Sequence, residues 1–366
     1  MSAVVPYENI ERGADWLRGG PEGDVVISSR VRLARNLAGV SFPGRMSGAE
    51  STRLMRLAQQ ATLDIHPPVA DGAQSLLPNK LHWVQMAELA ALDRMLLVER
   101  HLVSKEHAKS DRVRALLLSL PDERHSIMVN EEDHLRMQCV MPGLALGQAW
   151  AAINDVDDQF EEQLDFAYLP RLGYLTACPT NVGCGARLSV MLHLPASRLS
   201  GELERVKRAA KDMNLTLRGF YGEGSDGAGD LYQISNQTTL GRSEEQLREM
   251  IELRVVPQIV AFERKVRDEL LRQRSRYFED QIFRSFGTLR SARLLTPEEA
   301  MAGLSLVRLG VVLGLITGLS TAAVTQLMLL CQPAHLQRLL HREMDQQARR
   351  EARADLVRHR LVCCNW

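Results

Sequence analysis

Residues 129–138 read VNEEDHLRMQ, in which three consecutive carboxylates, Glu131, Glu132 and Asp133, closely precede Arg136. The β-leaning run SIMV that leads into this stretch favours a strand, so the acidic residues are expected in the loop that follows it. Carboxylates this close together repel one another, and one arginine cannot neutralise all three. The loop therefore predicts a positively charged partner, which could be a cationic substrate, a metal ion or arginines from elsewhere in the chain. A solvated acidic loop without a partner is the alternative that these residues alone leave open.

Length and composition predict a soluble globular protein of two domains, or of one large domain with an appendage. The chain has 366 residues, of which 45% are hydrophobic and 25% charged. The formal net charge is zero, so nothing in the overall charge predicts a nucleic-acid or membrane partner. The six cysteines show no C-x-x-C pair and no zinc-like spacing, which predicts a reducing cytoplasmic location and no metal held by the protein itself. The N-terminal residues lack the apolar segment of a signal peptide.

A change in hydrophobic pattern predicts the domain organisation. Strand and loop signals dominate residues 1–242, with helices predicted over 47–60 and 87–98. From residue 243 to 366 only helical periodicity remains, so a separate helical domain is predicted there. The uncharged stretch 309–332 is long enough to span a bilayer. The sequence GLST within it reads as a helix end followed by a helix start, which favours two short buried helices instead.

Two arginines near the N-terminus predict an anion site. A strand is expected from residue 25, and Arg30 and Arg32 would project to one face of it because side chains alternate along a strand. Neighbouring arginines repel unless an anion bridges them, and arginine binds phosphate oxygens in a bidentate fork. The chain has neither a Walker loop nor a dinucleotide fingerprint, so side chains would have to hold a phosphate. An ordinary pair of surface arginines is the alternative.

Four short motifs resemble those of the ATP:guanido phosphotransferases, the family of arginine and creatine kinases. They are residues 29–32 (SRVR), 130–136 (NEEDHLR), 178–181 (CPTN) and 234–236 (ISN), in family order and with family-like separations. The resemblance implies an α+β fold in which an antiparallel β-sheet is flanked by helices, as in the phosphagen-kinase catalytic domain, followed here by an all-α C-terminal domain. It also implies that ATP is bound by arginines, and that Mg²⁺ is bound through ATP.

The same resemblance implies roles for individual residues. A guanidinium has a pKa above about 12 and is a poor nucleophile while protonated, so carboxylates must orient it and take a proton. By resemblance Glu132 is the principal carboxylate and base, Asp226 in the glycine-rich loop is its partner, and Cys178 is a reactive thiol near the substrate. The implied ATP-binding residues are Ser28, Ser29, Arg30, Val31, Arg32, His101, Arg136, Arg187, Leu188, Ser189, Val190, Met191, Arg218, Gly219, Phe220, Tyr221, Gly222 and Glu223.

Within the family the chain is most similar to the bacterial protein-arginine kinases. Only 28 residues precede the SRVR motif, where the kinases of small guanidines carry a whole helical domain, and those enzymes have no counterpart of the region after residue 243. This resemblance implies phosphorylation of arginine residues in proteins, which marks them for a Clp-type protease in a stress response. It further implies a homodimer, a heat-shock repressor and an activator protein as partners. A small-molecule guanidino kinase and a non-catalytic phosphoarginine-binding adaptor are the alternatives.

The helical domain of those kinases carries a phosphoarginine pocket with the pattern Arg-Asp-x-x-Arg-Ala. The best match here predicts a pocket at Arg349, Arg350, Arg353 and Ala354. Arg350 replaces the aspartate of the pattern. A basic, solvated helix face is the alternative for this stretch.

Overall fold

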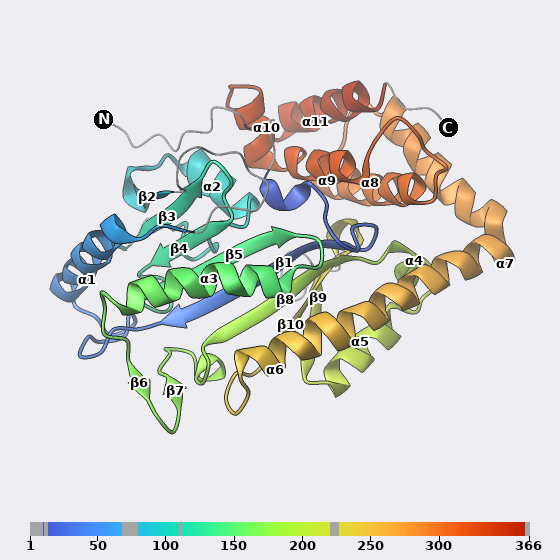
Figure 1. Ribbon diagram of the computed structural model, residues 1–366. Coiled ribbons are helices and arrows are strands. Elements are labelled where there is room, and N and C mark those ends of the chain that lie inside the picture. The colour runs from blue at the N-terminus through green and yellow to red at the C-terminus, as the bar shows by residue number, and fades with distance from the viewer. Residues whose placement is uncertain (1–9, 11–13, 68–79, 110–111, 220–226, 363–366) are drawn as a thin grey trace.

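An eight-stranded antiparallel sheet forms the centre of the molecule, in the order β2-β3-β4-β5-β1-β8-β10-β9 (Figure 1). The computed structural model describes residues 10, 14–67, 80–109, 112–219 and 227–362. The strands are β1 Val26–Arg35, β2 Lys80–Gln85, β3 Ala115–Leu120, β4 His125–Val129, β5 Leu135–Pro142, β8 Ala186–His193, β9 Leu215–Gly219 and β10 Leu231–Asn236. A separate hairpin pairs β6 (Tyr168–Leu169) with β7 (Gly173–Tyr174). The predicted antiparallel sheet is confirmed.

Helices flank this sheet and form the whole C-terminal region. They are α1 Gly48–Ala61, α2 Ala91–Glu99, α3 Leu146–Glu161, α4 Pro195–Leu199, α5 Leu203–Asp212, α6 Glu244–Arg248, α7 Val256–Ser291, α8 Pro297–Val312, α9 Thr321–Leu330, α10 Pro333–Leu339 and α11 Gln346–Leu361. A π-helical turn, Glu249–Val255, joins α6 to α7. Figure 1 shows α3 lying across one face of the sheet and α8 to α11 grouped beyond one end of its strands.

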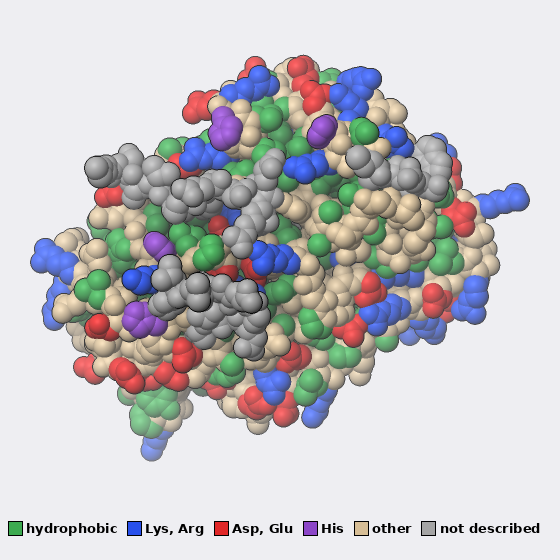
Figure 2. Space-filling view, turned by 45° about the horizontal axis from the view of Figure 1, so that its top comes forward, with side chains coloured by type: hydrophobic (Ala, Val, Ile, Leu, Met, Phe, Trp, Pro, Cys, Tyr) green, Lys and Arg blue, Asp and Glu red, His purple; other side chains and the backbone are tan. Residues whose placement is uncertain are grey.

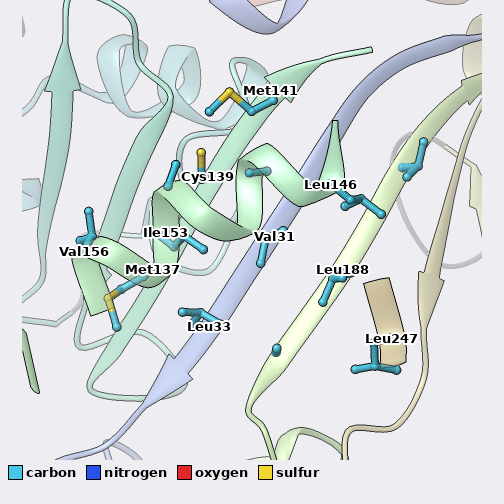
Figure 3. Close-up of a cluster of buried hydrophobic side chains, with 14 of the residues drawn as sticks. Val31, Leu33, Met137, Cys139, Met141, Leu146, Ile153, Val156, Leu188 and Leu247 are labelled. Carbon is cyan, nitrogen blue, oxygen red and sulfur yellow. The ribbon is translucent and has the colours of Figure 1, made fainter. Parts of the chain in front are cut away.

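Strands at the centre of the sheet have one apolar and one polar face. On β1, Val31 and Leu33 are fully buried and pack with α3, as Figure 3 shows. Met137 of β5 and Leu188 of β8 join the same core. Because side chains alternate along a strand, the residues between them point to the opposite face. This opposite face carries the arginines that the sequence analysis singled out.

Hydrophobic packing crosses the predicted domain boundary at residue 243. Leu247 and Ile251, at the start of the helical region, belong to the core beneath the sheet. Phe278 and Phe286 of α7 belong instead to a second core that the later helices build. That second core also includes Met191 of β8, so it joins the helical region to the sheet. The boundary itself stays a prediction.

Local signals in the helical region behave as predicted. Thr296 caps α8 with a capping box to Glu299, and Pro297 occupies the first helical position. The apolar stretch after residue 309 breaks between α8 and α9, with Ser320 as the N-cap of α9. Among the described residues, no helix is both long and apolar enough to cross a membrane.

Candidate active site

Four arginines from three neighbouring strands meet on the polar face of the sheet. Arg30 and Arg32 come from β1, Arg136 from β5 and Arg187 from β8. Arg32 lies directly opposite Arg187 on one side and Gln138 on the other in the strand register. Opposed residues of antiparallel strands have neighbouring side chains, so the ladder itself brings these guanidinium groups together. The predicted shared face of Arg30 and Arg32 is confirmed.

These arginines line a cavity of ≈ 680 Å³. Arg218 of β9 and Gln233 of β10 extend its polar lining, and Gln233 accepts a 2.6 Å hydrogen bond from Arg30 Nη2. The volume falls within the range of about 300–1,000 Å³ that is usual for small-molecule sites. On the face that Figure 2 shows, basic and acidic side chains are interspersed.

Carboxylates balance the arginine charges in this cavity only in part, through the ion pair of Arg136 with Glu131. Burial, together with the charges of Arg136 and Arg187, lowers the pKa of Arg30 to about 10. Burial and the charges of Arg30, Arg136 and Arg187 hold the pKa of Arg32 well below its usual value. Among the residues that the structure describes, none forms a hydrogen bond or ion pair with the side chain of Arg32, whose Nε is buried. A polyphosphate would relieve this repulsion and supply the missing acceptors, so the site fits ATP.

His101 enters the same cavity from the turn after α2. Its φ of 61° places it in the left-handed region, and this ends the helix and turns the chain towards the sheet. Burial, with the charges of Arg30, His335 and Arg32, lowers the pKa of His101 to about 3. The imidazole is therefore neutral at pH 7 and adds no positive charge to the arginine group, which consists of Arg30, Arg32, Arg136 and Arg187.

The three consecutive carboxylates of the β4–β5 loop have different roles. Glu131 pairs with Arg136 at 2.8 Å and accepts a 2.7 Å hydrogen bond from Ser104 Oγ. Burial opposes its ionisation, but these contacts together lower the pKa of Glu131 to about 2. Asp133 is buried and accepts from Asn36 Nδ2 and Ala177 N, both at 2.7 Å. Glu131 and Asp133 are therefore already occupied within the protein.

Glu132, between them, is the carboxylate left for a substrate. Its side chain is exposed and makes no hydrogen bond or ion pair with the described residues. Partial burial and the charges of Asp133 and Glu131 raise its pKa, while Arg136 and Arg187 oppose the rise. A carboxylate with a raised pKa beside a cationic site is suited to accept a proton. Glu132 thus lies near Arg136 and Arg187, with its acceptor oxygens available.

The loop that carries Cys178 is tied to the acidic loop. The hydrogen bond from Ala177 N to Asp133 joins the residue before Cys178 to the residue after Glu132. Cys178 is partly exposed, and its Sγ lies 3.1 Å from Thr180 Oγ1. The structure therefore brings the predicted base and the predicted thiol to neighbouring loops, as the resemblance implies.

The remaining predicted nucleotide residues lie in different environments. Ser28, Ser189 and Met191 line a small cavity of ≈ 20 Å³ beside Arg30 and His101. Ser29 is buried and bonded to the backbone of Gly143 and Ala145. Three more of these residues, Val31, Leu188 and Val190, have side chains buried in the core. Only their backbone atoms could contact a nucleotide. Gly219 lines the main cavity. Phe220, Tyr221, Gly222, Glu223 and Asp226 lie outside the described residues.

The predicted phosphoarginine pocket lies on α11. Arg353 is buried and donates to the carbonyl oxygens of Cys331 at 2.7 Å and Leu295 at 2.9 Å, so its guanidinium holds two loops together. Ala354 is fully buried, whereas Arg349 and Arg350 are partly exposed. Arg353 and Ala354 are thus used in packing here, and the pocket stays a prediction.

Sequence reasoning missed several residues of the cavity. Gln138 could have been found, because it stands two residues after Arg136 and so shares its face of β5. Gln233 carries the same kind of signal on β10, where it pairs in register with Arg218. Met301 and Gln332 also line the cavity, but nothing local in the sequence marks them.

Comparison with known proteins agrees with this geometry. Residues 69–266 match the family described as ATP:guanido phosphotransferase, C-terminal catalytic domain, and residues 275–365 match the Protein-arginine kinase McsB C-terminal domain. A protein-arginine kinase of Moorella thermoacetica is 44% identical over 97% of this chain and 99% of its own, and one of Halothermothrix orenii is 43% identical over 94% and 96%.

Solved structures show the same fold at lower identity. The duplicated taurocyamine kinase of Schistosoma mansoni aligns with a TM-score of 0.57 and 24% identity, over 66% of this chain and 33% of that chain. A lombricine kinase aligns with a TM-score of 0.56 and 21% identity, over 73% and 72%. The chain therefore belongs to the ATP:guanido phosphotransferase family and, within it, to the protein-arginine kinases.

Proposed function

We propose that the arginine group of the cavity holds the phosphates of ATP while Glu132 receives the guanidinium of an arginine residue in a protein substrate. One observation carries this proposal: the partly buried side chain of Arg32 lies among three other arginines and has no partner among the described residues, and the unpaired Glu132 lies near two of them, Arg136 and Arg187. The cationic group matches a polyphosphate, and the carboxylate matches a guanidinium. Donor and acceptor would therefore meet between them.

The chemistry of transfer follows from these positions. A nitrogen of the acceptor guanidinium forms a bond to the γ-phosphorus as the bond from that phosphorus to the leaving oxygen of ADP breaks. Glu132 orients the acceptor through its carboxylate and takes the proton that the attacking nitrogen loses. Arg32, Arg136 and Arg187 stabilise the negative charge on the phosphoryl oxygens and on ADP during transfer.

Magnesium would be brought by the nucleotide. Among the described residues, no group of three or more His, Cys, Asp or Glu side chains could hold a metal ion. Mg²⁺ usually keeps several waters and binds substrate phosphates rather than an all-protein cage, and there it neutralises phosphate charge. The protein's own contribution is then the group of arginines that lines the cavity.

We further infer the cellular role that the family resemblance suggests. The kinase would act in the cytoplasm as a homodimer, marking damaged proteins for a Clp-type protease during stress. A heat-shock repressor and an activator protein would be its other partners. The matched C-terminal family and the names of the relatives support the activity on protein arginine, and the cellular role is inferred from the resemblance alone.

The catalytic proposal is tested by incubating the protein with ATP, Mg²⁺ and an unfolded basic protein. Mass spectrometry under non-acidic handling should detect phosphate on arginine, and Glu132→Gln should abolish it while ATP still binds. Transfer to free arginine or creatine but not to protein would instead identify a small-molecule guanidino kinase. Nucleotide binding without turnover on any acceptor would identify an adaptor.

A further inference from the structure

The helical region supplies part of the cavity wall. Pro297, Glu298 and Met301 of α8 line it, as do Gln332 and Pro333 at the junction of α9 and α10. These residues lie more than 50 positions beyond the last strand of the sheet, β10 (Leu231–Asn236). The cavity is therefore a joint product of the sheet and of the region matched to the C-terminal family.

The cavity has a cationic part and an apolar part. The arginines of the sheet, together with Lys105, provide the cationic part, which can balance phosphate charge. Apolar lining comes from Met95 and Val98 of α2, together with Met301 and the ring of Pro333. A purine is flat and apolar on both faces, and methionine sulfur makes favourable contacts with aromatic rings. A nucleotide with its phosphates at the arginines therefore places its base and ribose against this apolar part.

A buried polar clamp fixes this wall to the sheet domain. The carboxylate of Glu99, the last residue of α2, accepts hydrogen bonds from Ala334 N at 2.8 Å and His335 N at 2.9 Å. It also lies 2.7 Å from His335 Nδ1. Glu99 thus caps the N-terminus of α10 from another part of the chain. Arg100, the next residue, reaches His335 Nε2 at 3.4 Å.

The clamp adjoins the residue that enters the cavity. Glu99 and Arg100 immediately precede His101, whose left-handed backbone directs it towards the arginines. Arg100 is itself fixed by Glu123, at 2.5 Å from its Nη2. The same turn therefore holds α10 on one side and presents His101 on the other. Figure 1 shows α2 and α10 adjacent in the fold, consistent with the hydrogen bonds between them.

We propose that the helical region is a structural part of the nucleotide site: Met301 and Pro333 contact the nucleoside end of ATP, and Glu99 is the positioning residue that holds them there. The inference rests on the proposed assignment of the arginine group to the phosphates. It makes ATP binding depend on how the helical region is seated. Any event that loosens α10 from α2 would then weaken ATP binding without touching a phosphate-binding arginine.

Two ligands distinguish binding at the cationic part of the cavity from binding at the apolar part. Inorganic tripolyphosphate tests the arginine part alone, whereas ADP tests both parts. Calorimetry on Glu99→Gln and Met301→Ala should show ADP binding weakened about tenfold, equivalent to 1.4 kcal/mol, with tripolyphosphate affinity unchanged. The matched control is Glu269→Gln, which removes a carboxylate 3.7 Å from Lys265 on the surface of α7 and should alter neither affinity.

Hydrogen exchange gives a second readout that needs no substitution. In the wild-type protein, ADP should slow amide exchange in the first turns of α8 and α10 more than tripolyphosphate does. Equal losses of ADP and tripolyphosphate affinity in the variants, or unchanged exchange in both turns with ADP, would overturn the proposal. Failure of the wild-type protein to bind tripolyphosphate would contradict the phosphate assignment itself, which is a different result.

Discussion

Arg32 and Arg35 stand three residues apart on β1 and have opposite environments. Arg35 is buried on the apolar face, where its Nε and Nη2 donate to Asp157 of α3 at 3.1 and 2.6 Å. It also lies 3.5 Å from the centre of the Tyr174 ring. Arg32 lies on the other face among like charges, with no partner among the described residues. One strand thus carries a fully buried, paired arginine and a partly buried, unpaired one.

The difference shows how a structural arginine is distinguished from a ligand-binding one. Burying a guanidinium is unfavourable unless hydrogen bonds and an opposite charge compensate for the lost water. Arg35 has this compensation within the protein, so it stabilises the fold. Arg32 lacks it, and the compensation must come from outside. An arginine without such compensation, with three more arginines on the same face, identifies a polyanion site more strongly than any single short motif.

The largest expected effect is on activity at Arg32. Arg32→Met should lower kcat/KM for protein phosphorylation by about 10³-fold or more, the scale of losing an arginine that stabilises a transferring phosphoryl group. Initial rates with ATP and an unfolded acceptor protein measure it. The variant should remain folded, because the substitution removes one of several neighbouring positive charges that repel one another. Near wild-type kcat/KM would show that Arg32 does not contact the phosphates.

Arg35 should show the opposite pattern. Arg35→Met leaves the carboxylate of Asp157 buried without its partner, so the free energy of unfolding should fall by about 3–5 kcal/mol. Urea unfolding followed by circular dichroism measures this loss. The double variant Arg35→Met with Asp157→Leu should recover most of the stability, because the uncompensated charge is then gone. A stable single variant would contradict the structural role.

The pH dependence of the reaction should report Glu132. Its pKa is raised, so the carboxylate needed as base is lost on acidification at a higher pH than for an ordinary glutamate, whose value is 4.5. The acid side of the kcat/KM profile should therefore have its midpoint above 4.5. Glu131 contributes to the rise, so Glu131→Gln should move this midpoint to lower pH. A midpoint unchanged by Glu131→Gln would assign the titration to another group.

The smallest effect is expected for an arginine that is neither buried nor at the site. Arg284 pairs with Asp280 on α7 at 2.9 Å, and both side chains are exposed. Arg284→Ala should change the free energy of unfolding by only about 0.3–0.5 kcal/mol, as for other exposed helix pairs, and leave kcat/KM unchanged. If Arg284→Ala lowered the free energy of unfolding as much as Arg35→Met, exposure would not distinguish surface arginines from structural ones.

The sequence predicted the polar face of β1 because period-two alternation is a local property. It could not separate Arg32 from Arg35, since the partner of Arg35 lies on α3 and only the fold brings Asp157 beside it. Helix α2 was predicted from residue 87, but it begins at Ala91. A 3₁₀ turn precedes it, held by a tertiary hydrogen bond from Met86 N to Arg114 O.

The sequence likewise predicted some residues of the candidate site and missed others. The motifs identified the arginines and Glu132, because those residues stand in short strings with family spacing. Met301 and Gln332 escaped notice because their place in the cavity depends on how two distant parts of the chain pack. Asp226 falls outside the described residues, so its pairing with Glu132 stays a prediction.

Unfolding of the Arg32→Met variant with and without nucleotide tests the central claim most directly. Without nucleotide, its free energy of unfolding should equal or exceed that of the wild-type protein. With saturating ADP and Mg²⁺, the wild-type protein should gain stability by about 2.7 kcal/mol at 100 times the Kd, and the variant should gain little. If the variant instead loses stability without nucleotide and gains as much as the wild-type protein with it, Arg32 is a structural arginine and the account is wrong.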